Sequence, residues 1–161
     1  MNKKAILDLI VDTLQRDLCA LQEAVQLAHD SATHAESKAE NKYDTRGLEA
    51  SYLAHGQAQR AEQIATALAH YKSLVGSVHD CEQGVALDSL VQLMDDAGAV
   101  RWVWLGAEAG GLTLSYDGHL VRVVTPQAPL GKAMLGKQPG DEVALDIQGV
   151  LHEYEIVRLY Y

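Results

Sequence analysis

The chain has 161 residues, of which 48% are hydrophobic and 22% charged, and its formal net charge is −9. This composition is too rich in core-forming residues for a disordered chain. The excess of acids argues against sequence-independent binding to nucleic acid, because that binding depends on Lys and Arg at the phosphates. We recognise no leader and no apolar run long enough to span a bilayer. The composition therefore predicts a folded cytoplasmic protein, without a membrane partner, that binds mainly to another protein.

The first half of the sequence carries two apolar stripes with steps of three and four residues, a spacing typical of paired helices. The first stripe is Leu14, Leu18, Leu21, Val25, Ala28, Ala32 and Ala35, and the second is Ala54, Gln57, Ala61, Ile64, Leu68, Tyr71, Val75 and Val78. Large residues come first in one stripe and last in the other. Antiparallel pairing brings large residues opposite large ones, so we predict a coiled-coil hairpin over residues 1–78 with its tip near 41–47.

A coiled coil between two chains is the alternative interpretation of these stripes. The opposed size gradients are satisfied when a single chain folds back on itself, so we predict a monomer. The tip region, ESKAENKYDTRGLEA at residues 36–50, is dense in both carboxylates and cations. Such a turn is commonly only a solvated loop, and Asn41 and Asp44 are residue types that cap helix ends.

The second half changes to short apolar stretches separated by turn-forming residues, a pattern typical of strands. The stretches cover residues 87–94, 100–105, 112–116, 120–124, 142–147 and 151–159. Between the fourth and fifth, a short helix is predicted to start near Ala128, with Pro129 in its first turn, and to end at Gly136. We therefore predict an α+β protein in which residues 79–161 form a β-rich domain with one short helix.

Several residue types were considered as sites. Trp102 and Trp104 alternate on one predicted strand and so share a face, as core anchors or as a docking patch, with the core favoured. Cys19 and Cys81 are interpreted as two buried thiols, because no second pair completes a zinc site. The seven histidines lack metal-ligand spacing, and no nucleophile elbow or phosphate loop is present. The residues alone indicate no enzyme active site.

Two segments carry a resemblance to a known family. PLGKAMLGKQPGDEV at residues 129–143 and EYEI at 153–156 resemble the C-terminal signature of the GreA/GreB transcription elongation factors. The resemblance implies an antiparallel coiled coil followed by an FKBP-like domain. It also implies an accessory factor that binds RNA polymerase, inserts its coiled coil into the secondary channel and comes near the nascent RNA. In cleavage-competent members two acidic tip residues help to hold a Mg²⁺ shared with the polymerase, and the factor has no cofactor of its own.

The tip departs from the family pattern, in which an aspartate is followed three residues later by a glutamate. Here the residue three beyond Asp44 is Gly47. Asp44 and Glu49 are the candidates for both the cleavage role and the Mg²⁺ contact, and Glu40 is a third candidate for cleavage. Two functions stay open, namely a factor that stimulates transcript cleavage and a non-cleaving regulator or inhibitor of polymerase. A third alternative is a coiled-coil dimer with an FKBP-like prolyl isomerase domain.

Overall fold

The computed structural model describes residues 1–33, 46–75 and 84–160. Two compact units are present. The helical unit is Val11–Lys72, and the β-rich unit combines Met1–Ile10 with Ser73–Tyr161. The predicted domain boundary between residues 78 and 79 and most of the predicted tip at 41–47 lie outside the described residues. No helix of the described part is long and apolar enough to cross a membrane.

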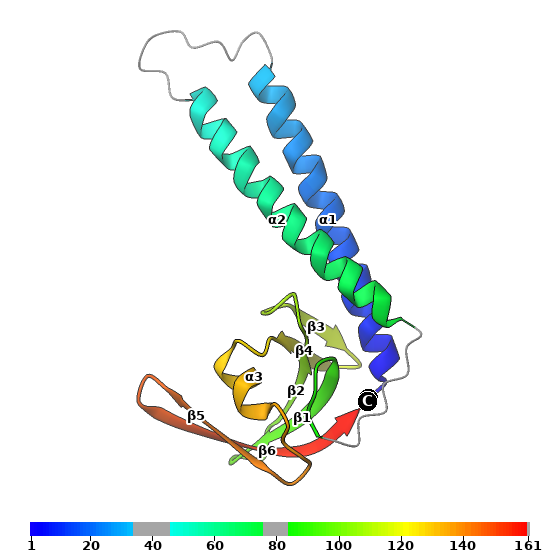
Figure 1. The fold of residues 1–161 in the computed structure, drawn as a ribbon, viewed down its shortest axis with the longest axis vertical. Coiled ribbons are helices and arrows are strands. Elements are labelled where there is room, and N and C mark those ends of the chain that lie inside the picture. The colour runs from blue at the N-terminus through cyan, green and yellow to red at the C-terminus, as the bar shows by residue number, and fades with distance from the viewer. Residues whose placement is uncertain (34–45, 76–83, 161) are drawn as a thin grey trace. The chain divides into compact units, whose positions relative to one another are not determined.

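In the helical unit, α1 (Lys3–Thr33) and α2 (Arg46–Leu74) lie side by side and run in opposite directions (Figure 1). The Lys72 ammonium donates a hydrogen bond to the Gln15 side-chain oxygen at 2.9 Å, which joins the two helices. Among the residues of this unit whose side chains the structure describes, those that are buried are Leu14, Ile64, Ala67, Leu68 and Tyr71. Four of these lie on the predicted stripes, so the predicted apolar contact between the helices is confirmed there.

Burial along the helical unit is graded. Leu18, Leu21 and Val25 of α1 are only half-buried, as are Gln57 and Ala61 of α2. Large apolar side chains of the same unit that are more than half exposed include Leu27, Tyr52 and Leu53. The apolar seam is therefore deepest around Leu14 and residues 64–71 and thinner at the described positions farther along.

Two predictions about burial are wrong. Val75, assigned to the second stripe, is 47% exposed, because α2 ends at Leu74 and the helical phase is lost after it. Cys19 is exposed rather than buried. It follows the seam residue Leu18 and lies about 100° further round the helix, which turns its side chain to solvent. Cys81 lies outside the described residues.

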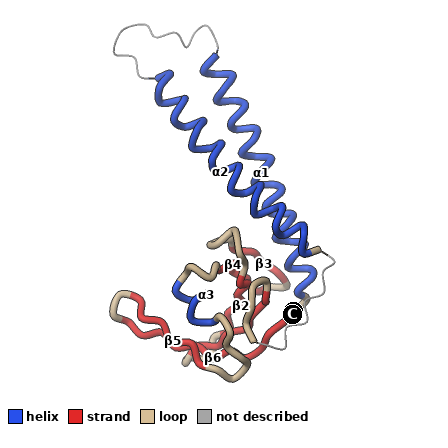
Figure 2. The backbone as a smooth tube through the Cα atoms, viewed as in Figure 1, coloured by secondary structure: helices blue, strands red, loops and turns tan. Residues whose placement is uncertain are grey.

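The β-rich unit contains a six-stranded mixed sheet and one short helix (Figure 2). The strands are β1 (Ser89–Asp95), β2 (Val100–Leu105), β3 (Thr113–Tyr116), β4 (His119–Val124), β5 (Glu142–Ile147) and β6 (Val150–Tyr160). Their order across the sheet is β3-β4-β2-β1-β6-β5, with β2 and β4 parallel and the other neighbours antiparallel. The predicted α+β class is confirmed, and each predicted strand is present to within two residues at each end.

One face of the sheet packs against α3 (Pro129–Met134). The cluster on this face is Val85, Val91, Leu93, Val103, Leu105, Val124, Met134, Val143, Leu145, Tyr154 and Ile156. Ala128 precedes the helix in an extended conformation and Pro129 occupies its first turn, where the missing N–H costs no hydrogen bond. The predicted short helix is confirmed, although it ends at Met134, before Gly136.

The opposite face carries the two tryptophans. Trp104 is fully buried and Trp102 is 8% exposed, so their interpretation as core residues is confirmed. Lys3, at the start of α1, places its ammonium 5.6 Å from the centre of the Trp104 ring. Ile6, Leu7 and Ile10 are also buried. The first turns of α1 therefore belong to the core of the β-rich unit.

Candidate functional site

The segment that resembles the Gre signature forms one tightly held substructure around α3. Gly131 is buried where a Cβ atom would overlap the carbonyl oxygen of Thr125, so only glycine fits at that position. Val85 donates its N–H to the Lys137 carbonyl and accepts the Gly136 N–H, both at 2.7 Å. The close approach of Gly131 to Thr125 and the two hydrogen bonds of Val85 after the end of α3 hold the segment against the core. Its outer surface therefore has a fixed shape.

The outer surface of this segment is part basic and part apolar. Pro129, Lys132, Leu135 and Lys137 are all exposed, and Leu135 is 51% exposed. Met134 between them is fully buried and fixes the register of the helix. We call these four exposed residues the α3 surface. A leucine between two lysines suits contact with a protein that offers an apolar position flanked by acids.

The two parts of the signature meet in space. Asp141 accepts a hydrogen bond from the Gln138 N–H at 2.8 Å, which closes the turn before β5. Ile156 then pairs its backbone with Gly140 and Asp141, and Val143 lies opposite Tyr154 in the sheet. The residues of 138–143 and 153–156 are therefore neighbours, so the resemblance covers one folded unit rather than two separate fragments.

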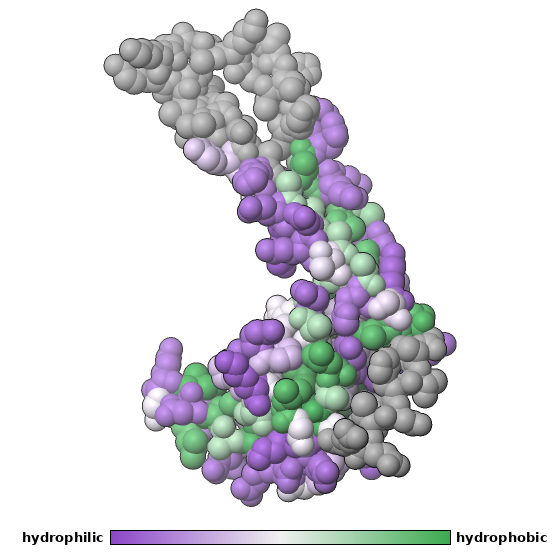
Figure 3. All heavy atoms as spheres, in the orientation of Figure 1, coloured by the Kyte–Doolittle hydropathy of each residue, from purple (hydrophilic) through white to green (hydrophobic). Residues whose placement is uncertain are grey.

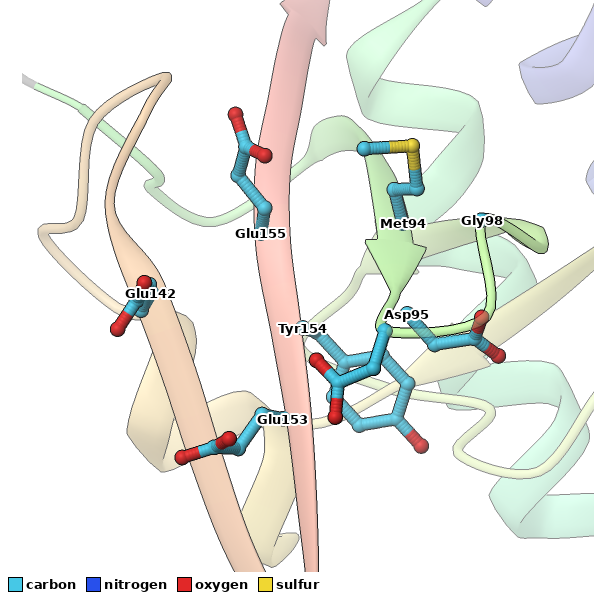
Figure 4. A pocket seen from close by; sticks show the side chains of 8 residues that line it. Met94, Asp95, Gly98, Glu142, Glu153, Tyr154 and Glu155 are labelled. Carbon is cyan, nitrogen blue, oxygen red and sulfur yellow. The ribbon is translucent and has the colours of Figure 1, made fainter.

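An acidic pocket of about 270 Å³ lies where these two segments meet the end of β1 (Figure 4). Its lining is Met94, Asp95, Asp96, Gly98, Glu142, Glu153, Tyr154 and Glu155. Asp95 has a structural role, because one carboxylate oxygen accepts the N–H groups of Ala97 and Ala99 in the turn after β1. Its other oxygen lies 3.7 Å from Arg101, whose guanidinium stands 5.5 Å from the centre of the Tyr154 ring.

The remaining acids of this pocket, Asp96, Glu142, Glu153 and Glu155, are exposed. Among the residues that the structure describes, no group of three or more His, Cys, Asp or Glu side chains is placed to hold a metal ion. The pocket is thus a negatively charged surface that suits a cationic partner.

The predicted tip residues are only partly within the described chain. Glu40 and Asp44 lie outside it, and Glu49 belongs to the first turn of α2, where its backbone alone is described. Their assignment to cleavage and to a shared Mg²⁺ stays a prediction. Neither the exposure of Leu135 nor the acidic pocket was predicted from the sequence. The alternation of acids at Glu153 and Glu155 signals an exposed face, but only the pairing of β6 with β1 brings them near Asp95.

Comparison with known proteins gives structural likenesses at low sequence identity. No protein-family model matches the chain, and no curated protein matches it. The GreA factor homolog 1 (Gfh1) protein of Thermus thermophilus is 23% identical over 94% of both chains, with a TM-score of 0.38. Another structure, of the transcription factor Gfh1, is 23% identical over 95% of this chain and 94% of its own, with a TM-score of 0.41.

The prokaryotic transcription elongation factor GreA/GreB from Nitrosomonas europaea is also similar. It is 22% identical over 74% of this chain and 96% of its own, with a TM-score of 0.39.

Proposed function

We propose that this protein is a Gre-type transcription factor that binds RNA polymerase. The observation that carries the proposal is the signature at residues 129–143 and 153–156, whose two parts are joined by Val143 opposite Tyr154. Because the two parts of the signature are neighbours in the fold, the resemblance belongs to one packed substructure. The proposal includes an FKBP-like fold for the β-rich unit and a cytoplasmic location.

The proposal gives the two units different roles. The β-rich unit docks on the rim of the polymerase secondary channel through the α3 surface, and the helical unit enters the channel as an intramolecular coiled coil of a monomer. With 31 and 29 residues, α1 and α2 are about 46 and 44 Å long at 1.5 Å per residue. Beyond Leu14 the described part of the helix pair buries few apolar side chains. Long helices with so little buried surface gain little stability for the entropy lost in ordering them, which supports a role in reaching into the polymerase.

Docking is tested at the α3 surface. Lys132→Glu reverses a charge and Leu135→Ser removes an exposed apolar contact, and neither residue contributes to the core cluster. Leu120→Ser is the matched control, because Leu120 is 68% exposed on β4, outside the segments that resemble the signature. We expect weaker polymerase binding for the first two variants and normal binding for the control. Equal binding by all three would reject this docking surface.

The proposal extends to transcript cleavage through the tip acids Asp44 and Glu49, with Glu40 as a third participant. A Mg²⁺ shared with the polymerase would stabilise charge on the attacking and leaving oxygens, and carboxylates are the ligands that this hard cation prefers. Cleavage would be catalysed by the polymerase active site, with this protein as an accessory factor that acts near the nascent RNA.

A non-cleaving regulator of polymerase is the second candidate, and the missing Asp-to-Glu spacing at Asp44 and Gly47 favours it. Stalled elongation complexes with Mg²⁺ separate the two functions when wild type, Asp44→Ala, Glu49→Ala and Glu36→Ala are compared. Loss of shortened transcripts in Asp44→Ala and Glu49→Ala, but not in Glu36→Ala, supports cleavage. Absence of cleavage in the wild type, with polymerase binding intact, supports the regulator.

A further inference from the structure

The β5–β6 hairpin ends in a two-stranded ribbon with one open edge. β5 is the last strand of the sheet, and β6 pairs with β1 only from Tyr154 onward, so residues 150–153 pair with β5 alone. In Figure 1 this hairpin extends past the rest of the sheet. Within the described chain, no strand lies beyond β5. The backbone groups on its outer side are therefore available to another strand.

The register identifies which residues present these groups. Gln148 and Gly149 form a two-residue turn with φ of 57° and 82°, so Ile147 and Val150 close the hairpin as a hydrogen-bonded pair. Hydrogen-bonded pairs alternate along an antiparallel ladder. The N–H and C=O groups of Glu142, Ala144 and Asp146 therefore point away from β6, toward the open edge.

The two faces of this hairpin differ in chemistry. Val143 and Leu145 continue the core face, which runs on to Ile147 and Val150 at 48% and 57% exposure. The other face carries the acids Glu142, Asp146, Glu153 and Glu155, together with the exposed Leu151, which lies opposite Asp146. Figure 3 shows hydrophobic and hydrophilic residues side by side at the end of this hairpin. An added strand would thus meet apolar neighbours on one side of the sheet and carboxylates on the other.

Charge decides which occupant fits the edge. Glu142 lies directly opposite Glu155, and like charges at such positions repel. A second copy pairing antiparallel about Ala144 would place its Asp146 opposite Glu142, adding further repulsion. A strand that carries Lys or Arg at those positions would instead neutralise the acids of the edge and of the neighbouring pocket.

We propose that the open edge of β5 binds an extended segment of a protein partner by strand addition. The segment alternates cationic and apolar side chains, with cations opposite Glu142 and Asp146 and apolar residues beside Leu145 and Ile147. Backbone hydrogen bonds supply affinity in this mode, and the alternate side chains supply specificity. This surface is separate from the α3 surface, so the inference goes beyond the proposed docking on polymerase.

The experiment measures binding of a fluorescent peptide with the repeating order Lys-Val to the full-length protein at low salt. A control peptide has the same residues arranged as a Lys block followed by a Val block. Ala144→Pro removes the outward N–H while sparing the pairing with β6, since proline is tolerated where an edge N–H faces solvent. Ala144→Val is the matched control, because it retains that N–H on a strand-compatible residue.

We expect the alternating peptide to bind wild type and Ala144→Val with equal affinity. It should bind Ala144→Pro at least about tenfold more weakly, because a main-chain hydrogen bond is lost and the proline ring keeps the added strand at a distance. The double variant Glu142→Gln with Asp146→Asn should bind about two- to tenfold more weakly and depend less on salt, although the other acids of the pocket keep their charges. Asn at 146 retains the side-chain oxygen that accepts the Gly149 N–H at 2.8 Å.

Four outcomes would overturn the proposal. Equal binding of the alternating and block peptides, or unchanged binding by Ala144→Pro, would mean charge attraction without strand addition. Self-association of the wild type that Ala144→Pro abolishes would assign the edge to a second copy. Absence of binding to wild type would remove the edge as a docking site. If Ala144→Pro unfolds, the comparison of the alternating and block peptides on wild type decides the matter independently.

Discussion

Buried side chains lie on both faces of the sheet in the β-rich unit, whereas in the helical unit they follow one stripe. Trp104 and Leu90 on one face, and Leu93 and Ile156 on the other, are all fully buried. In the helical unit most burial is concentrated near Leu14 and residues 64–71. Side chains of the sheet pack against neighbours on both faces and on adjacent strands, whereas side chains of a two-helix pair pack only against the other helix. We therefore expect the β-rich unit to be rigid and the helical unit to unfold locally more easily.

The two units can be monitored separately. Both tryptophans, Trp102 and Trp104, belong to the β-rich unit, so their fluorescence reports unfolding of that unit. Far-UV circular dichroism is dominated by α1 and α2, which supply most of the helical residues described. Fluorescence and circular dichroism therefore follow the unfolding of the two units separately.

The largest effect is expected in the sheet core. Ile156→Ala should lower the free energy of unfolding of the β-rich unit by about 2–5 kcal/mol, since it removes a fully buried side chain and leaves a cavity. Denaturant titration followed by tryptophan fluorescence measures it. Val157→Ala is the control, because Val157 is the next residue and is 38% exposed. Similar losses in the two variants would contradict the assigned packing of β6.

A graded effect is expected along the helical seam. Leu68→Ala should cost about 2–3 kcal/mol, near the low end for buried leucines, because Leu68 is 5% exposed in a two-helix contact. Leu21→Ala should cost clearly less, since Leu21 is already half-exposed to water. Circular dichroism against denaturant measures both. Equal losses would mean that the seam is as deep around Leu21 as around Leu68.

Much of this architecture could be predicted because it depends on local sequence. The strands from Val100 and Glu142 begin where turn residues end and apolar residues alternate. Pro129 marked the first turn of α3 for the same local reason. The burial of Leu14 and Leu68 followed from helical spacing, which fixes the side of the helix that each residue occupies.

The rest depended on distant partners that no local pattern identifies. The β1–β6 pairing has a register shift between Gln92 and Leu93, and it decides that Asp95 lies opposite Tyr154 beside the acidic pocket. The exposure of Cys19 depends on the narrow width of the helix contact rather than on its residue type. Leu7 continues the steps of three and four of the first stripe toward the N-terminus, so its burial could have been predicted. The burial of Ile6, off this stripe, depends on the β-rich unit to which it belongs.

Replacing a glycine by alanine should lower the free energy of unfolding at one position in the β-rich unit and raise it at another in the helical unit. Gly131→Ala should destabilise the β-rich unit by about 1–3 kcal/mol, because its Cβ would overlap the Thr125 carbonyl. Gly56→Ala should stabilise the helical unit by about 0.5–1 kcal/mol, since nothing lies within 4 Å of its added Cβ and alanine favours helix. Fluorescence and circular dichroism melts measure them. Tolerance of alanine at residue 131 would contradict the close packing of the signature segment.

The smallest effect concerns the acidic face of the β-rich unit. Glu142→Gln should raise its free energy of unfolding by about 0.2–1 kcal/mol, because Glu142 stands directly opposite Glu155 and the variant removes a like-charge pair. The gain should shrink as salt is added, since both carboxylates are exposed and their repulsion is screened. Glu153→Gln removes the same charge from the same face, but its cross-strand partner is Ala144, so its gain should be smaller. Fluorescence-monitored denaturant titrations at low and high salt compare the two variants. An equal gain in both would attribute the effect to the overall negative charge of the chain, whereas a gain limited to Glu142 would show that this edge carries a local repulsion that a cationic strand could relieve.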